Sequence, residues 1–248
     1  MDLGWPRRRR FITKRCALAD FISLSARDGA GQFTAYAVEP STKPTAAIVI
    51  IQEVFGVNPN IRRICHRWGE DGYLTIAPDL FWRLQAGVEL NREIPEELAV
   101  ALDLMRRFDA PKGLEDIAVA IDYARQRVAK VGVLGFCLGG RLAYLSATRG
   151  DPDAGVLFYG NIEDLMGLAS SLTTPFQAHF AGDDHVIPQR AVETVRKGLS
   201  HKRNVSIFEY PGVEHGFAGE FGPRRNVSAA ELANDRARHF FREHLRTR

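Results

Sequence analysis

The segment Lys130-Val131-Gly132-Val133-Leu134-Gly135-Phe136-Cys137-Leu138-Gly139-Gly140 decides the fold. It predicts a short apolar strand, a tight glycine-rich turn and the start of a helix. In a Gly-x-nucleophile-x-Gly turn, the residues two before and two after the nucleophile must be small, and Gly135 and Gly139 meet that need. The turn lifts the sulfur of Cys137 above the sheet at a helix N-terminus, which favours the thiolate. The segment predicts a catalytic nucleophile, and a buried structural cysteine is the alternative.

Predicted strands and helices alternate along the rest of the chain. The strands are expected at residues 33–38, 46–52, 73–77, 130–134, 155–159, 175–180 and 205–209. The helices are expected at residues 60–69, 95–108, 114–128, 138–148, 189–199 and 228–245, with a Pro-Lys-Gly break at 111–113. This alternation predicts an α/β fold, with a mostly parallel, doubly wound sheet flanked by helices. Ligands bind such sheets beyond the carboxyl ends of the strands.

Length and composition are those of an ordinary globular domain, with 248 residues, 45% apolar and 25% charged. Six of the 33 basic residues and two of the 30 acidic ones lie in residues 1–20, so 27 basic and 28 acidic residues remain beyond that segment. We expect residues 1–20 to be a basic, disordered extension and residues 21–248 to form a single domain. A body with a slight negative charge does not predict nucleic-acid binding.

The targeting signals are weak. The stretch Arg8-Arg9-Arg10-Phe11-Ile12-Thr13-Lys14 resembles a twin-arginine signal, but the apolar region that such a signal needs does not follow it. The longest apolar runs are too short to span a bilayer. Three cysteines cannot pair completely, and a domain of this size needs no disulfides. We expect a cytoplasmic protein without a membrane partner.

A thiol nucleophile needs a histidine base and a carboxylate that orients it, in the chain order nucleophile, acid, histidine. Asp183 and Asp184 follow the strand predicted at 175–180, and His215 follows the strand at 205–209. From the residues alone, either aspartate can be the orienting acid. A single Asp-Asp-His run without a partner cluster does not predict a metal site, and the glycines fit neither a dinucleotide nor a phosphate-binding loop. No metal or cofactor is expected.

Five segments, taken together and in order, resemble the dienelactone hydrolase family of α/β-hydrolases over roughly residues 21–245. The segments are Gln52–Asn58, Pro78–Arg83, Gly135–Gly140, Asp184–Pro188 and His215–Phe217. The resemblance implies the α/β-hydrolase fold. It also selects Asp184 over Asp183, because the family's acid loop has the pattern Asp-His-x-Val-Pro.

The resemblance implies further roles near the nucleophile. Glu53 matches a glutamate that interacts with the cysteine and controls its ionisation, although on its own it could be a solvent-facing strand end. The backbone N–H of Val54 would join that of Leu138 in the oxyanion hole. Two charges of the same sign at close range disfavour each other, which gives Glu53 a physical means of control.

The resemblance also implies substrate contacts from Arg83, Phe55 and Trp82. Arg83 matches an arginine that binds a substrate carboxylate, and a surface arginine beside Trp82 is the alternative. The family's best-known members carry a second such arginine where this chain has Gly219. Arg224 or Arg225 could replace it from nearby, but nothing in the sequence places them.

We therefore expect a hydrolase that cleaves lactone or ester bonds through a Cys137-His215-Asp184 triad and an acyl-thioester. The alternative is a broad carboxylesterase or thioesterase that acts on neutral small esters. A non-catalytic binding protein on the same fold is a third interpretation. The expected partner is a small lactone or ester, with or without a carboxylate, and the protein is expected to be a monomer or a weak homo-oligomer.

Overall fold

The structure is a computed structural model that describes residues 18–245, and its strands form one eight-stranded sheet. The strands are β1 (Leu18–Ser25), β2 (Gln32–Glu39), β3 (Ala46–Ile51), β4 (Leu74–Pro78), β5 (Lys130–Phe136), β6 (Ala154–Phe158), β7 (Phe176–Ala181) and β8 (Val205–Tyr210). Their order across the sheet is β1-β2-β4-β3-β5-β6-β7-β8. Strands β3 to β8 run parallel, whereas β1 and β2 form an antiparallel edge.

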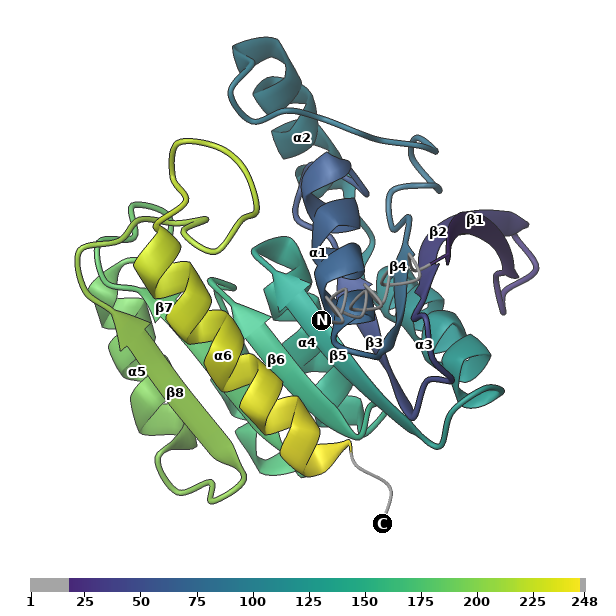
Figure 1. The fold of residues 1–248 in the computed structure, drawn as a ribbon. Helices are drawn as coiled ribbons and strands as arrows, with labels where there is room; N and C mark the ends of the chain where they lie inside the picture. The colour runs from purple at the N-terminus through teal and green to yellow at the C-terminus, as the bar shows by residue number, and fades with distance from the viewer. Residues whose placement is uncertain (1–17, 246–248) are drawn as a thin grey trace, which may run out of the picture.

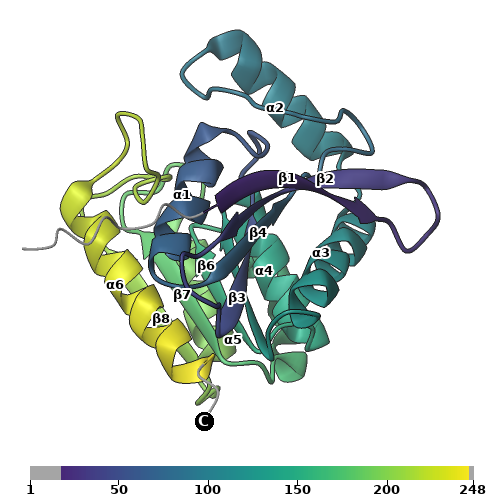
Figure 2. The same cartoon turned by 45° about the vertical axis from the view of Figure 1, so that its right-hand side comes forward.

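Six α-helices and one 3-10 helix lie within the described residues. They are α1 (Pro59–Glu70), α2 (Pro95–Arg107), α3 (Ala110–Arg125), α4 (Leu138–Arg149), α5 (Gln189–Leu199), α6 (Val227–His244) and the 3-10 helix η1 (Glu163–Ser171). Helices α1 and α6 cover one face of the sheet, and α3, α4 and α5 cover the other (Figures 1 and 2). None of the helices in residues 18–245 has the length and apolar character needed to cross a bilayer.

The sheet is buried on both faces, which explains why its central strands are apolar throughout. Every residue of β3 is buried. Side chains alternate along a strand, so Ile48 and Ile50 pack in the core under α1 and α6, while Ala47 and Val49 pack in the core under α3 and α4. This confirms the predicted α/β fold with a mostly parallel sheet.

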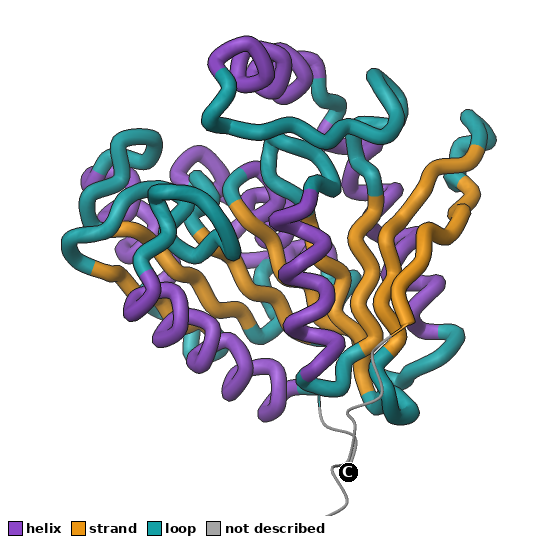
Figure 3. The backbone as a smooth tube through the Cα atoms, turned by 45° about the horizontal axis from the view of Figure 1, so that its top comes forward, coloured by secondary structure: helices purple, strands orange, loops and turns teal. Residues whose placement is uncertain are grey.

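The loops that follow the parallel strands gather at one end of the sheet, together with α2 (Figure 3). Cys137 directly follows β5, Asp184 follows β7 and His215 follows β8. In a parallel sheet the carboxyl ends of all strands meet at the same edge. The topology therefore brings together side chains that are far apart in the sequence.

Two local predictions are wrong. The break at 111–113 does not exist, because Pro111 sits in the first turn of α3, where its missing N–H costs nothing, and Asp109 caps the helix by accepting from the N–H of Lys112 at 3.1 Å. Strand β1 was not predicted, and because it includes residues 18–20, the expected disorder is wrong for those residues. The prediction of a disordered extension for residues 1–17 lies outside the described residues. Helix η1 was also not predicted.

Candidate active site

The turn after β5 holds Cys137 in a conformation that few residues adopt. Its φ of 52° and ψ of −114° lie outside the usual regions for a residue with a side chain, and such strain is typical of functional sites. A Cβ on Gly135 would lie 1.9 Å from the carbonyl oxygen of Gly139, and a Cβ on Gly139 would lie 2.2 Å from that of Ile51. Neither position therefore has room for a side chain. The N–H of Cys137 donates to the carbonyl of Phe158 at 3.0 Å, which fixes the turn against β6.

The loops after β7 and β8 bring a carboxylate and an imidazole together. His215 Nδ1 lies 2.8 Å from Asp184 Oδ2, and both side chains are almost fully buried. The other carboxylate oxygen, Asp184 Oδ1, accepts from the N–H groups of Val186 and Ile187 at 2.8 and 2.9 Å, which fixes the carboxylate. Asp183 is exposed. The aspartate that contacts the imidazole is therefore Asp184.

The pKa values of Asp184 and His215 are shifted in opposite directions. Burial alone would raise the pKa of Asp184. The hydrogen bond with His215 and those from the two backbone N–H groups outweigh burial, so the pKa is lowered below its ordinary value. Burial lowers the pKa of His215, whereas the hydrogen bond with Asp184 and the nearby side chain of Cys137 raise it to about 9. A protonated imidazole is therefore favoured beside the sulfur at neutral pH.

Glu53 lies just beyond the end of β3 and is not the solvent-facing strand end that its sequence allowed. It is 7% exposed, and its Oε2 accepts from Asn60 Nδ2 at 3.3 Å. Burial raises the pKa of Glu53, while the positive charges of Arg92 and His215 and the bond from Asn60 oppose the rise. The net effect is a pKa above the ordinary value for a glutamate. Glu53 thus lies close enough to His215 for its charge to matter there.

Two backbone N–H groups close to Cys137, those of Val54 and Leu138, have no hydrogen-bond partner within residues 18–245. Leu138 is the first residue of α4, where N–H groups have no acceptor within the helix. Val54 follows Glu53 in the loop after β3. Within residues 18–245, no hydrogen bond joins either N–H to a protein acceptor. Both donors are therefore available to a bound group.

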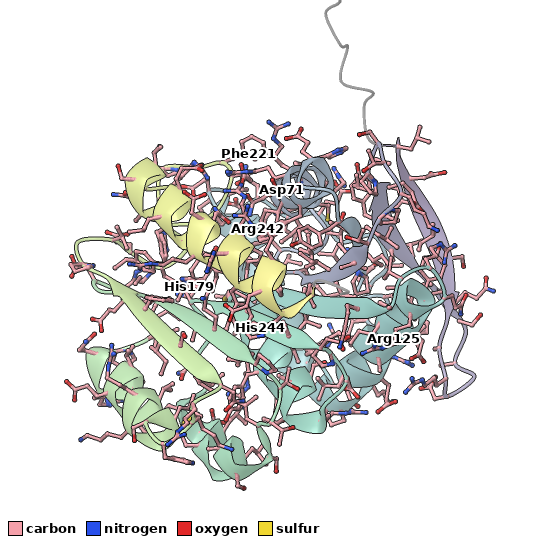
Figure 4. The ribbon with its side chains drawn as sticks, turned by 60° about the horizontal axis from the view of Figure 1, so that its bottom comes forward. Asp71, Arg125, His179, Phe221, Arg242 and His244 are labelled. Atoms are coloured by element: carbon pink, nitrogen blue, oxygen red, sulfur yellow. The ribbon has the colours of Figure 1, made fainter. Side chains whose placement is uncertain are left out.

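A pocket of about 310 Å³ opens beside this cluster. Its wall includes Glu53 and Phe55 from the loop after β3, Arg92 from the segment between β4 and α2, and Gly216 and Arg224 from the loop after β8. The loop after β8 also carries Phe221, which lies at the opposite end of α6 from His244 (Figure 4). Of the predicted site residues, Glu53 and Phe55 line the pocket, whereas Cys137 and His215 lie next to it and are not part of its wall.

The structure does not place Trp82 and Arg83 in this pocket wall. The guanidinium of Arg83 contacts Asp116 and Asp28, each at 2.9 Å, and lies 4.4 Å from the centre of the Trp82 ring. Trp82 Nε1 also donates to Asp116, at 2.8 Å. The geometry does not support substrate contacts by either residue, because the buried carboxylate of Asp116 already holds both.

Other residues at the site were missed by the sequence analysis. Arg92 lies in a polar loop without a motif, and Asn60 is an ordinary residue near a helix start. Tyr159 carried a signal, because it ends a predicted strand beside the nucleophile turn. Its φ is 40°, and its ring centre lies 5.0 Å from that of His215. Within residues 18–245, no three histidine, cysteine or acidic side chains form a group that could hold a metal ion.

Comparisons with known proteins identify the family of the chain. The model of the dienelactone hydrolase family matches residues 33–245. Carboxymethylenebutenolidase 1 of Cupriavidus pinatubonensis is 34% identical over 223 residues, and carboxymethylenebutenolidase of Pseudomonas putida is 33% identical over the same length, each covering 88% of this chain and 94% of the relative. The crystal structure of dienelactone hydrolase from Anabaena variabilis, at 18% identity, covers 94% of this chain and 100% of its own with a TM-score of 0.70, which shows the shared fold. The chain therefore belongs to the dienelactone hydrolase family and is a hydrolase of the carboxymethylenebutenolidase type.

Proposed function

We propose that the protein hydrolyses lactone or ester bonds with Cys137 as the nucleophile, His215 as the group that transfers protons and Asp184 as the residue that orients it. One observation carries the proposal. The imidazole of His215 is held by the carboxylate of Asp184, and the Cys137 side chain is close enough to raise the pKa of that imidazole. This is the arrangement that nucleophilic acyl transfer needs.

In the first half-reaction, the sulfur of Cys137 attacks the substrate carbonyl as a thiolate, beside the protonated imidazole of His215. The carbonyl oxygen becomes negatively charged and accepts hydrogen bonds from the N–H groups of Val54 and Leu138. Loss of one such donor typically costs about 2.7–4 kcal/mol in the transition state. The carbon–oxygen bond then breaks, His215 donates its proton to the leaving oxygen, and an acyl-thioester remains on Cys137.

In the second half-reaction, the neutral imidazole of His215 accepts a proton from water as the water attacks the thioester. The carbon–sulfur bond breaks, which releases the acid and restores the thiolate beside the imidazolium. When the substrate is a lactone, the leaving oxygen stays attached to the acyl group, so the product is one opened hydroxy- or keto-acid. A sulfur nucleophile favours esters with good leaving groups, such as enol lactones.

Glu53 is proposed to control the charge of this cluster. A negative carboxylate beside the sulfur would make the thiolate less favourable, because both charges would share a poorly solvated site. Glu53→Gln removes that charge and should increase the rate at which iodoacetamide labels Cys137 at neutral pH. An unchanged labelling rate would remove Glu53 from this role.

The central test is Cys137→Ala. We expect hydrolysis of 4-nitrophenyl acetate and of an enol lactone to fall by about a thousandfold or more, while circular dichroism shows an intact fold. Cys65→Ala is the matched control, since Cys65 is buried in α1 and burial raises its pKa to about 12. Full turnover by the Cys137→Ala protein would overturn the proposal.

A further inference from the structure

Helix α2 lies beyond the end of the sheet, together with the loops that carry the proposed catalytic groups, and not against either face of the sheet (Figures 1 and 3). Its outer side is exposed, with 47% of Leu102 and 41% of Met105 open to solvent. Two of its residues, Ala101 and Leu104, are buried. The residues that this buried side covers show what the helix is placed to contact.

The buried side of α2 packs on the nucleophile turn. Ala101 is fully buried in a small apolar cluster, and the partly buried side chains of Leu98 and Cys137 pack against that cluster. Leu98 and Ala101 are three residues apart, so they share one side of the helix. The other residues of this α2 cluster are Val54, Phe55, Leu90 and Leu138. The α2 cluster thus combines the proposed nucleophile with both residues that are proposed to supply oxyanion N–H groups.

The C-terminal half of α2 is anchored on the same turn. Leu104 belongs to a second apolar cluster that includes Phe81, and Leu138 packs against it. Directly after the helix, the ring centre of Phe108 lies 5.7 Å from that of Phe81, with the rings edge to face. These contacts fix the position of α2 relative to the nucleophile turn.

The direction of an acyl group on Cys137 follows from the other groups around the attacked carbon. The carbonyl oxygen is proposed to accept from the oxyanion N–H groups, and the leaving oxygen must face His215, which donates the proton. His215 lies toward the pocket of about 310 Å³, since its neighbour Gly216 is part of the wall. The leaving group is therefore expected on the pocket side, and the acyl group has to take another direction.

Cys137 packs against two apolar clusters that differ in their access to solvent. One is the core between the sheet and helices α1 and α6, in which Tyr159 is fully buried. A close-packed interior of this kind has no room for an acyl chain. The other is the α2 cluster, whose Leu98 is only partly buried. Phe55 and Leu90 belong both to the α2 cluster and to the wall of the pocket, so the two adjoin.

We propose that Leu98 and Ala101 form the wall that meets the acyl group of the substrate, so that the protein favours esters and lactones with a small acyl group. The proposal rests on the proposed function, because it assumes that Cys137 receives the acyl group. In a lactone the leaving oxygen stays attached to the acyl group, and the same wall limits substituents on the carbon next to the carbonyl.

The test compares 4-nitrophenyl acetate with 4-nitrophenyl hexanoate, which share a leaving group and differ only in the acyl chain. Leu98→Ala should raise the ratio of kcat/KM for the hexanoate to kcat/KM for the acetate by about 10-fold or more, because the shorter side chain frees space for the longer acyl chain. Leu98→Phe should lower the ratio. Ala101→Val should lower it as well, since it adds volume at a fully buried position of the same wall.

The matched control is Leu102→Ala, the same substitution on the exposed side of α2, which should leave the ratio unchanged. Circular dichroism checks that each variant is folded. If Leu98 only held the helix in place, Leu98→Ala would lower both rates by the same factor and leave the ratio where it was. An unchanged ratio in Leu98→Ala, with hydrolysis that still depends on Cys137, overturns the wall and leaves the proposed function standing.

A labelling experiment separates the two proposals, because it needs no turnover. The thiolate of Cys137 attacks the divalent sulfur of an alkyl methanethiosulfonate, which forms a mixed disulfide and releases methanesulfinate. Mass spectrometry of the peptide that contains Cys137 gives the rates for a hexyl and a methyl reagent. Leu98→Ala should raise the ratio of the hexyl rate to the methyl rate by about 10-fold or more, while Leu102→Ala leaves it unchanged.

The outcomes of the labelling experiment are distinct. Equal ratios in the wild-type and Leu98→Ala proteins overturn the wall. If Leu98→Ala raises the ratio but the wild-type protein hydrolyses neither ester, the proposed function fails and the wall stands.

Discussion

Two buried histidines at the same end of the sheet, His179 and His215, have opposite ionisation properties. His179 is fully buried on β7, and His215 is 3% exposed on the loop after β8. Each lies beside an aromatic ring. The ring centres of Phe158 and His179 are 4.5 Å apart, and those of Tyr159 and His215 are 5.0 Å apart. Burial lowers the pKa of His179 to about 3, yet the pKa of His215 is raised to about 9.

The charge of the hydrogen-bond partners accounts for the difference. His179 bonds to two neutral groups, the Tyr210 hydroxyl and the Gln177 carboxamide oxygen, each at 2.8 Å, and the nearby charge of Arg236 lowers its pKa further. His215 bonds to the carboxylate of Asp184. At similar burial, neutral partners favour an uncharged imidazole, whereas a carboxylate partner favours the protonated form.

Giving His215 a neutral partner should produce the largest effect. Asp184→Asn replaces the carboxylate with an amide of the same size, so that His215 resembles His179. We expect kcat to fall by about a thousandfold to ten-thousandfold, because the imidazolium loses its stabilising charge and the favoured tautomer changes. The pKa of His215, followed by NMR, should fall from about 9. An Asp184→Asn protein with nearly full activity would contradict this explanation.

The second-largest effect is expected in the free energy of unfolding at acidic pH, and it comes from His179. Its folded-state pKa is depressed to about 3, so its contribution to stability is complete above its unfolded pKa of about 6.5 and is lost as the pH falls toward 3. Between pH 7.5 and 4, the wild-type protein should lose about 3 kcal/mol of unfolding free energy through this group. Urea unfolding of His179→Gln, which cannot protonate, should show a correspondingly shallower loss. Parallel pH profiles for the two proteins would contradict the assignment.

His215 should act in the opposite pH range. Its folded-state pKa is raised to about 9, so its contribution to stability is complete below the unfolded pKa of about 6.5 and is lost as the pH rises through 9. Between pH 7 and 9.5, the wild-type protein should lose about 2 kcal/mol of unfolding free energy that His215→Gln does not lose. The measurement is urea unfolding at both pH values, and an equal alkaline loss in both proteins would count against a charged His215.

The smallest effect is expected when one of the two neutral hydrogen-bond partners of His179 is removed. Tyr210→Phe removes the hydroxyl that bonds His179 Nδ1 at 2.8 Å and accepts from Arg236 Nη1 at 3.1 Å. We expect a loss of about 1–2 kcal/mol in unfolding free energy, because a buried ring nitrogen loses its partner. Ester hydrolysis should not change. A fall in kcat without a fall in stability would instead link the His179 network to catalysis.

Much of the fold could be predicted because its signals are local. The apolar run of β3, the glycines around Cys137 and the acid and histidine after successive strands all occur in short segments. A parallel sheet converts this chain order into proximity at one edge. The predicted bounds of α5 agree with the structure for the same reason, because its apolar residues repeat at helical spacing.

The remaining features depend on contacts between distant residues. The motif around Arg83 indicated a substrate contact, but the carboxylate that holds its guanidinium is Asp116, which lies 33 residues further along in α3. Strand β1 is mostly exposed and lies at the sheet edge, so its apolar alternation is confined to Ile22 and Leu24, and the strand is held by its pairing with β2. Arg92 belongs to the site only because its loop folds against Gly216.

The acid loop and the histidine loop are joined to each other by backbone bonds. The N–H of Gly182 donates to the carbonyl of Tyr210 at 2.8 Å, and the N–H of Asp183 donates to the carbonyl of Val213 at 3.0 Å. These bonds fix the position of one loop relative to the other. In building chimeras with other family members, residues 181–188 and 210–217 should be exchanged together, since replacing one alone would shift Asp184 relative to His215.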